Sequence, residues 1–156
     1  MGDHVERGDP EAPRGPVDRA IREAIADHGP IGFDEYMELA LYSPGGFYES
    51  PPVGPDAHFV TSPHTHEIFG ELLARALRRQ WEQLGRPSPF PLVEVGAGDG
   101  TLARQLLGHL EDLPLDYTGV ERSEGARERL GAIPGLRVAE RLDDLPPIRD
   151  GVVLAN

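Results

Sequence analysis

The segment at residues 93–102, Val-Glu-Val-Gly-Ala-Gly-Asp-Gly-Thr-Leu, constrains the fold more than any other part of the chain. An apolar run ends at Val95, glycines alternate at Gly96, Gly98 and Gly100, and a helical pattern begins at once. This order predicts a strand, a tight turn and a helix N-terminus whose backbone amides face a nucleotide-like ligand. Glycine suits the turn because it accepts positive φ angles and because a Cβ would block close approach.

The spacing of the glycines favours S-adenosylmethionine over a dinucleotide. A dinucleotide turn has the pattern G-x-G-x-x-G, whereas the sixth position here is Thr101. Glu94 lies two residues before the first glycine, where its carboxylate is placed to orient the ammonium group of the ligand, directly or through water. The sequence therefore predicts a cofactor site built on Glu94 and on the turn as far as Gly100.

Two further acidic positions follow later predicted strands. Glu121 ends the second strand, where a carboxylate accepts hydrogen bonds from both ribose hydroxyls of an adenosine-containing ligand. Asp143 and Asp144 follow the third strand, at a position where an acidic side chain would lie near the adenine amino group. The choice between Asp143 and Asp144 stays open, as does a purely solvated loop.

The pattern of the chain predicts three parts. Residues 1–16 are polar and proline-rich and predict a disordered leader, and residues 17–90 predict a helical extension. The extension is expected to hold helices at 17–28, 34–42 and 64–84, the last a single helix that Ser62 and Pro63 begin.

From residue 91 to residue 156 strands alternate with helices, which predicts an α/β, Rossmann-like fold with a parallel sheet in the order 3-2-1-4. The strands are expected at 92–95, 117–120, 136–139 and 151–155. The last apolar strand ends where such sheets place their ligands, so we expect a truncated first half of a domain that is inactive as a fragment.

Composition excludes several classes of protein. A net charge of −12 without a basic stripe argues against nucleic-acid binding, and the absence of cysteine excludes disulfides and thiolate metal sites. No apolar run approaches the roughly 18 residues of a membrane span, and the N-terminus lacks a signal peptide, so we expect a cytoplasmic protein with no membrane partner. His58, His64 and His66 lack metal-binding spacing, and no metal is expected.

Short motifs between Pro16 and the C-terminus carry a family resemblance. They are I-G-F-D-E-Y-M at 31–37, Y-S-P at 42–44, G-F-Y at 46–48, F-V-T-S-P at 59–63, F-G-E at 69–71, Q-W at 80–81, the glycine segment at 92–102, E-R-S at 121–123 and A-N at 155–156. On these motifs the chain resembles the MidA family of S-adenosyl-L-methionine-dependent methyltransferases, relatives of the mitochondrial arginine methyltransferase needed for complex I assembly.

The resemblance implies roles for individual residues. Gly96, Ala97 and Gly98 would hold the methionine part of the cofactor, Glu121 would hold its ribose, and Thr61, Ser62 and Pro63 would lie near the mouth of the active site. The chain departs from the family at His64, where an acidic residue is usual.

The resemblance also implies an activity: transfer of a methyl group from S-adenosylmethionine to an acceptor, by analogy a protein arginine side chain. Such a transfer requires alignment of the acceptor and exclusion of water, without a metal. The sequence identifies no catalytic base and no oligomeric state. Two alternatives remain, a non-catalytic assembly module on the same fold, which the departure at His64 favours, and an NAD-dependent oxidoreductase, against which the glycine spacing argues.

Overall fold

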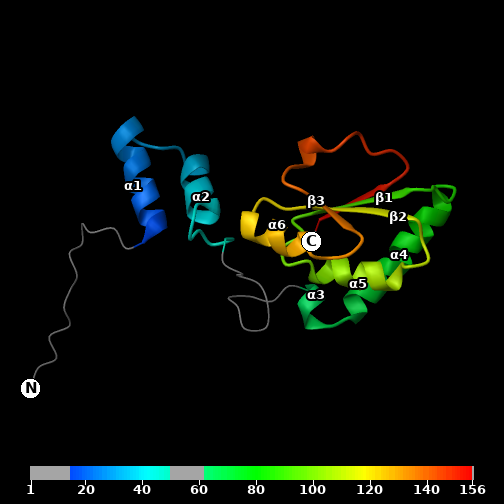
Figure 1. Cartoon of the computed structure of the whole chain (residues 1–156). Helices are drawn as coiled ribbons and strands as arrows, with labels where there is room; N and C mark the ends of the chain where they lie inside the picture. The colour runs from blue at the N-terminus through cyan, green and yellow to red at the C-terminus, as the bar shows by residue number, and fades with distance from the viewer. Residues whose placement is uncertain (1–14, 50–61, 156) are drawn as a thin grey trace, which may run out of the picture. The chain divides into compact units, whose positions relative to one another are not determined.

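The computed structural model describes residues 15–49 and 62–155, and these residues belong to two compact units, within 1–49 and within 50–156 (Figure 1). Residues 1–14 of the expected leader, Thr61 of the expected active-site mouth and Asn156 lie outside the described residues. The three-part division expected from the sequence stays a prediction. Among the described helices, none combines the length and the apolar character that a membrane crossing requires.

The first unit is a pair of helices, α1 (Pro16–His28) and α2 (Phe33–Tyr42), close to the expected bounds. Proline in the first turn of α1 needs no amide hydrogen, and the chain leaves the helix at Gly29 with a φ of 83°. Neither helix contains a fully buried residue, and Phe33 is 77% exposed. Residues 15–49 of this unit therefore contain no core of the kind found in the second unit.

The second unit is built on a four-stranded parallel sheet in the order β3-β2-β1-β4. The strands are β1 (Phe90–Val95), β2 (Leu115–Val120), β3 (Leu136–Ala139) and β4 (Val152–Ala155). Both the parallel sheet and the strand order confirm the fold class expected from the sequence. Because β1 lies between β2 and β4, the chain reverses direction across the sheet at the carboxyl end of β1, where open α/β sheets bind ligands.

One face of the sheet is covered by helices. The crossovers through α5 (Thr101–His109) and α6 (Glu124–Gly131) lie on this face, and α4 (Ile68–Gln83) packs against α5 (Figure 1). The core between them consists of buried apolar side chains from the strands and helices: Ala74, Leu77, Phe90, Leu92, Leu102, Ala103, Leu106, Leu110, Leu113, Tyr117, Leu130, Ile133 and Leu136. Full burial of one such leucine contributes about 1.5–3 kcal/mol, so this core holds the sheet in one register.

The prediction of a single helix at 64–84 is wrong, because the structure has two helices in this region. A short helix α3 (Ser62–Thr65) precedes α4, and the helical conformation is interrupted at His66. The Nδ1 atom of His66 accepts the amide of Ile68 at 3.0 Å, an amide that a continuous helix would direct to the carbonyl of His64. Because of this interruption α3 need not continue along the axis of α4, and in α3 the side chain of His64 reaches the glycine turn.

Candidate functional site

The glycine turn follows β1 directly, and its three glycines have positive φ angles of 74° at Gly96, 57° at Gly98 and 78° at Gly100. They serve two purposes. A Cβ on Gly96 would meet no atom within 4 Å, and one on Gly98 would meet only the Gly96 carbonyl at 3.9 Å, so both glycines border open space. A Cβ on Gly100 would collide with Ile133 and Leu130, so this glycine is required for packing against the end of α6.

The amides of Gly96, Ala97, Gly98 and Gly100 are bonded within the chain, so these four are not directed at a ligand as the glycine pattern predicts. Those of Gly96 and Ala97 donate to the carbonyl of Val120 at 2.9 and 3.2 Å, and that of Gly100 donates to Ala97 at 3.0 Å. The parallel pairing of Val95 with Val120 at the carboxyl ends of β1 and β2 brings the Val120 carbonyl within reach. At Gly96 and Gly98 the turn therefore offers a ligand backbone without side chains, beside which a group can approach closely.

Glu121, at the end of β2, lies across the turn from Gly98. One carboxylate oxygen accepts the Gly98 amide at 2.9 Å, and the other accepts the Ser123 amide at 2.9 Å. A carboxylate has about four acceptor positions, so two remain for hydroxyl donors. The two amides fix the orientation of the carboxylate, and the predicted pairing of Glu121 with the glycine turn is present in the structure.

Glu94 lies beneath the turn and is 4% exposed. The hydroxyl of Tyr117 donates to its Oε2 atom at 2.7 Å. Burial raises the pKa of Glu94 to about 7, the Tyr117 hydrogen bond opposes the rise, and the charges of Asp99 and Glu121 add to it. The sequence analysis missed Tyr117, although the alternation of β2 places it and Gly119 on one face of the sheet.

A second polar cluster joins α3 to the turn. The Nε2 atom of His64 lies 2.8 Å from Asp99 Oδ2 and 3.1 Å from Thr101 Oγ1, and the His64 side chain is 8% exposed. Burial raises the pKa of Asp99, but hydrogen bonds from His64 and Thr101 outweigh it and leave this pKa below its usual value. His64 therefore has a structural partner at the glycine turn, and the sequence analysis did not find this cluster.

The remaining predicted residues are placed as follows. Pro63 is buried, and its carbonyl accepts the side-chain amide of Gln105 at 2.9 Å, whereas Ser62 is exposed. Asp143 is exposed in η1 (Leu142–Asp144), after β3, and its neighbour Asp144 accepts the amide of Arg141. Contact with a cofactor stays a prediction for all three residues.

Two of the three histidines considered for a metal site make hydrogen bonds in the part of the chain that the structure describes. His64 contacts Asp99, and His66 accepts the Ile68 amide, while His58 lies outside the described residues. Across residues 15–49 and 62–155 no group of three or more histidine, aspartate or glutamate side chains is arranged to hold a metal ion.

A family model matches residues 72–155, more than half of the chain, and this family is described as "Putative S-adenosyl-L-methionine-dependent methyltransferase". The chain belongs to this methyltransferase family. The matched segment contains the sheet, the glycine turn and Glu121. The match confirms the family resemblance drawn from the sequence motifs.

Individual methyltransferases support the same assignment. The chain is 43% identical over 99 residues to "Protein arginine methyltransferase NDUFAF7 homolog, mitochondrial" from Drosophila melanogaster, which covers 62% of this chain and 23% of the relative. The chain is 38% identical over 99 residues to the human protein arginine methyltransferase NDUFAF7. This alignment covers 62% of this chain and 22% of the human protein. The chain thus spans about a quarter of the curated relatives it matches.

Two solved structures also match this chain. A crystal structure from Burkholderia thailandensis, bound to S-adenosyl-homocysteine, has a TM-score of 0.69 at 33% identity and covers 89% of this chain and 40% of that chain. A native crystal structure from the same organism has a TM-score of 0.64 at 31% identity and covers 89% and 37%. These matches confirm the Rossmann-like fold class.

The location named for the curated relatives overturns one expectation about this chain. The absence of a signal peptide led to the expectation of a cytoplasmic location, but the curated relatives from fly, frog and human are all named as mitochondrial proteins. The cytoplasmic assignment is therefore wrong. The N-terminal composition that suggested it falls on residues 1–14, outside the described residues.

Proposed function

We propose that this chain forms the cofactor-binding part of an enzyme that transfers a methyl group from S-adenosylmethionine to an acceptor. The observation that carries the proposal is the glycine turn, which borders open space at Gly96 and Gly98 and faces the oriented carboxylate of Glu121. Membership of the methyltransferase family supports it. S-adenosylmethionine suits this combination, since its ribose hydroxyls donate to a carboxylate while its methionine part lies along backbone without side chains.

The charges around the turn suit a cationic ligand. S-adenosylmethionine carries a sulfonium and an ammonium group, and three carboxyl groups surround the turn, those of Glu94, Asp99 and Glu121. Asp99 is held by His64 and Thr101, whereas Glu94 and Glu121 have acceptor positions left for a ligand. A positive group in this partly buried place is attracted more strongly than in water, because the local dielectric is lower.

When bound, S-adenosylmethionine supplies a methyl group on a positively charged sulfur, so the transfer needs no covalent enzyme intermediate. The residues of this chain bind and orient. Glu121 fixes the ribose, Glu94 fixes the ammonium group, and the backbone without side chains at Gly96 and Gly98 allows close approach. Alignment of the reacting groups is worth up to about 7–11 kcal/mol of the barrier in well-oriented reactions.

The acceptor in this proposal is a protein arginine side chain. Support comes from the curated relatives, which are named protein arginine methyltransferases. In the same proposal Ser62 and Pro63 border the mouth of the site, Ala97 and Gly100 shape the turn, and Asp143 contacts the adenine.

Calorimetric titration of the chain with S-adenosylmethionine tests the binding half of the proposal. We expect saturable heat for the unmodified chain, and at least about tenfold weaker binding for Gly98→Val, because valine is strained at positive φ and fills the open space. Gly108→Ala is the matched control, since a Cβ there meets no atom within 4 Å. Unchanged affinity in Gly98→Val would contradict the assignment of the turn.

S-adenosylmethionine with a labelled methyl group tests the acceptor. The chain alone is expected to be inactive, so the assay uses a protein that extends it to the full length of the curated relatives. The label is expected in arginine after hydrolysis of an arginine-rich protein incubated with this longer protein, and not after incubation with its Gly98→Val variant. Label in another amino acid would reject arginine, and saturable binding with no transferred label would favour the assembly module.

A further inference from the structure

Glu94 and Tyr117 form a buried polar pair on the helix-covered face of the sheet. In the register of β1 and β2, Leu92 is opposite Tyr117 and Glu94 is opposite Gly119, so the pair is diagonal. Gly119 has no side chain between them, and the phenol hydroxyl reaches Glu94 Oε2 at 2.7 Å. A Cβ on Gly119 would lie 3.0 Å from the Cβ of Ala97, so the pair sits directly under the glycine turn.

The surroundings of Glu94 contain acidic and apolar groups. The titratable groups that act on it are Tyr117 on β2, Asp99 in the turn and Glu121 at the end of β2. From β4 the residue opposite Glu94 is Leu154, and α5 buries Leu102 and Ala103 in the same core. None of the ion pairs within 15–49 and 62–155 involves Glu94. A proton on this carboxyl group is therefore favoured until a positive group arrives.

We propose that Tyr117 is a positioning residue that holds the Glu94 carboxyl group under the turn, and that binding of a cationic cofactor is coupled to loss of the Glu94 proton. The inference rests on the proposed function. The O–H bond of the carboxylic acid breaks, its electron pair stays on the carboxylate, and the proton leaves to solvent. The ammonium group of the cofactor replaces it as the positive partner, while Tyr117 keeps its hydroxyl hydrogen.

Two properties of Tyr117 support this role. Burial raises the pKa of its phenol, with the charge and hydrogen bond of Glu94 adding to the rise, so the hydroxyl remains a donor throughout the physiological range. The hydrogen bond it donates favours the charged form of Glu94 and lowers the pKa of this carboxyl group. Removal of the hydroxyl should therefore make the Glu94 proton harder to lose.

The coupling fixes how affinity depends on pH. With the pKa of Glu94 at about 7, binding at pH 7 should release about half a proton per chain. Affinity for S-adenosylmethionine should fall about tenfold per pH unit below pH 7 and level off above it, because only the ionised carboxylate binds the ammonium group.

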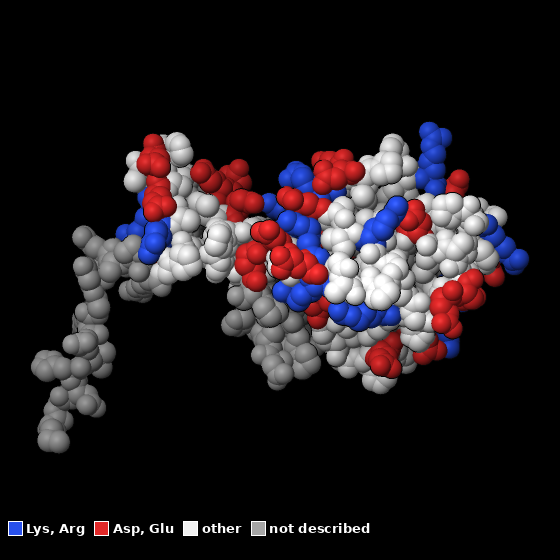
Figure 2. Space-filling view, viewed as in Figure 1, with Lys and Arg blue, Asp and Glu red and all other residues white. Residues whose placement is uncertain are grey.

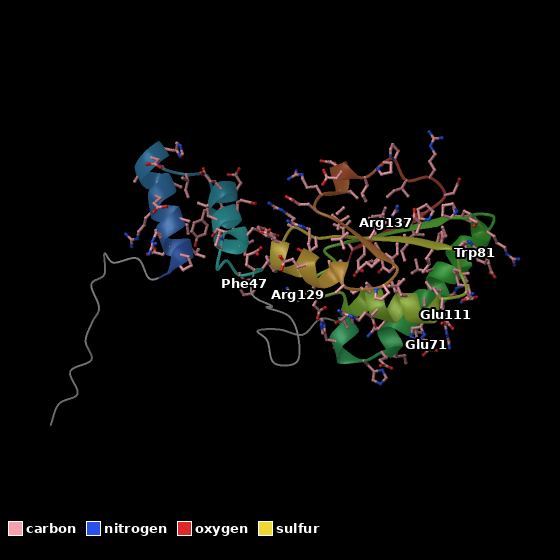
Figure 3. All side chains as sticks on the ribbon, in the orientation of Figure 1. Phe47, Glu71, Trp81, Glu111, Arg129 and Arg137 are labelled. Carbon is pink, nitrogen blue, oxygen red and sulfur yellow. The ribbon has the colours of Figure 1, made fainter. Side chains whose placement is uncertain are left out.

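The experiment is calorimetric titration of the chain with S-adenosylmethionine between pH 5.5 and 8, in phosphate and in Tris, whose different ionisation heats report the protons released. Methylthioadenosine, which lacks the ammonium group, should release none. Glu94→Gln should release none and lose the pH dependence, and Tyr117→Phe should move the midpoint of the affinity profile to higher pH. Glu111→Gln, an exposed site beyond the end of α5, should match the unmodified chain (Figure 3).

A pH titration followed by NMR, on the ligand-free chain labelled with ¹³C at its glutamate side chains, gives a readout that does not need cofactor binding. The Glu94 resonance, assigned by its loss in Glu94→Gln, should titrate near pH 7 and higher in Tyr117→Phe. Binding of S-adenosylmethionine without proton release, or equal midpoints in Tyr117→Phe and the unmodified chain, would overturn the coupling and leave the proposed function standing. No binding heat at any pH would overturn the proposed function and the coupling with it.

Discussion

The carboxyl group of Glu94 lowers the stability of the folded chain whenever it is ionised. Its pKa is about 7 in the folded chain, mainly because of burial, and 4.5 is the ordinary value. Between these two values the folded chain holds more protons than the unfolded chain, so stability falls as the pH rises through this window. Burial of the ionised Glu94 carboxylate therefore lowers the free energy of unfolding when no ligand is bound.

We predict that the free energy of unfolding of the unmodified chain falls by about 3 kcal/mol from pH 4.5 to pH 8 through this group alone. Glu94→Gln removes the fall, so the variant should be more stable than the unmodified chain at pH 8 and similar to it at pH 4.5. Urea unfolding at several pH values measures this difference. Glu111→Gln should follow the unmodified chain, and equal slopes for Glu94→Gln and the unmodified chain would refute the burial argument.

At the scale of elements, three helices meet at Gly70 in the first turn of α4. A Cβ on Gly70 would lie 2.5 Å from Gln105 Oε1 and 2.6 Å from Gln105 Cβ. The absence of a side chain at Gly70 therefore allows α4 and α5 to pack closely. Gln105 then donates to the Pro63 carbonyl of α3 at 2.9 Å. Together with the His64–Asp99 contact, this arrangement positions α3 against the helix that follows the glycine turn.

Two glycine-to-alanine substitutions in helices should therefore have opposite effects. Gly70→Ala should lower the free energy of unfolding by about 1–3 kcal/mol, because the added methyl group must displace Gln105. Gly108→Ala, near the end of α5 with open space around it, should raise it by up to about 1 kcal/mol through helix propensity. Urea unfolding compares the two variants, and a change of the same sign in both would show that packing at Gly70 is loose.

At the scale of the whole molecule, all the fully buried hydrophobic side chains of the described residues lie between Ala74 and Leu136, in the second unit. Arginine side chains on the second unit are interspersed with aspartate and glutamate on the face seen in Figure 2, without one continuous basic patch. The core, the sheet and the glycine turn thus lie together in one compact unit within residues 50–156.

We predict that a chain of residues 50–156 unfolds cooperatively with a Tm within a few degrees of that of the full chain, because removal of residues 1–49 takes away none of these buried side chains. Thermal unfolding followed by circular dichroism measures both values. A fall of more than about 10 °C would mean that α1 and α2 contribute several kcal/mol to the stability of the second unit.

The sequence by itself determined the fold class, the strand order and the pairing of the glycine turn with Glu121. These depend on local signals, namely the alternation of strands with helices, the glycine spacing and an acidic residue at the end of a strand. The helices α1 and α2 were likewise predicted to within about one residue, because apolar periodicity and breakers mark them.

The tertiary structure alone decided which polar groups meet. Tyr117 and Glu94 are 23 residues apart, and His64 and Asp99 are 35 residues apart. Their contacts depend on the register of two parallel strands and on the break at His66, and no local pattern encodes either. Packing of the core sets the register, and the register places a buried tyrosine beneath a glycine turn, where it acts on the charge of a carboxyl group.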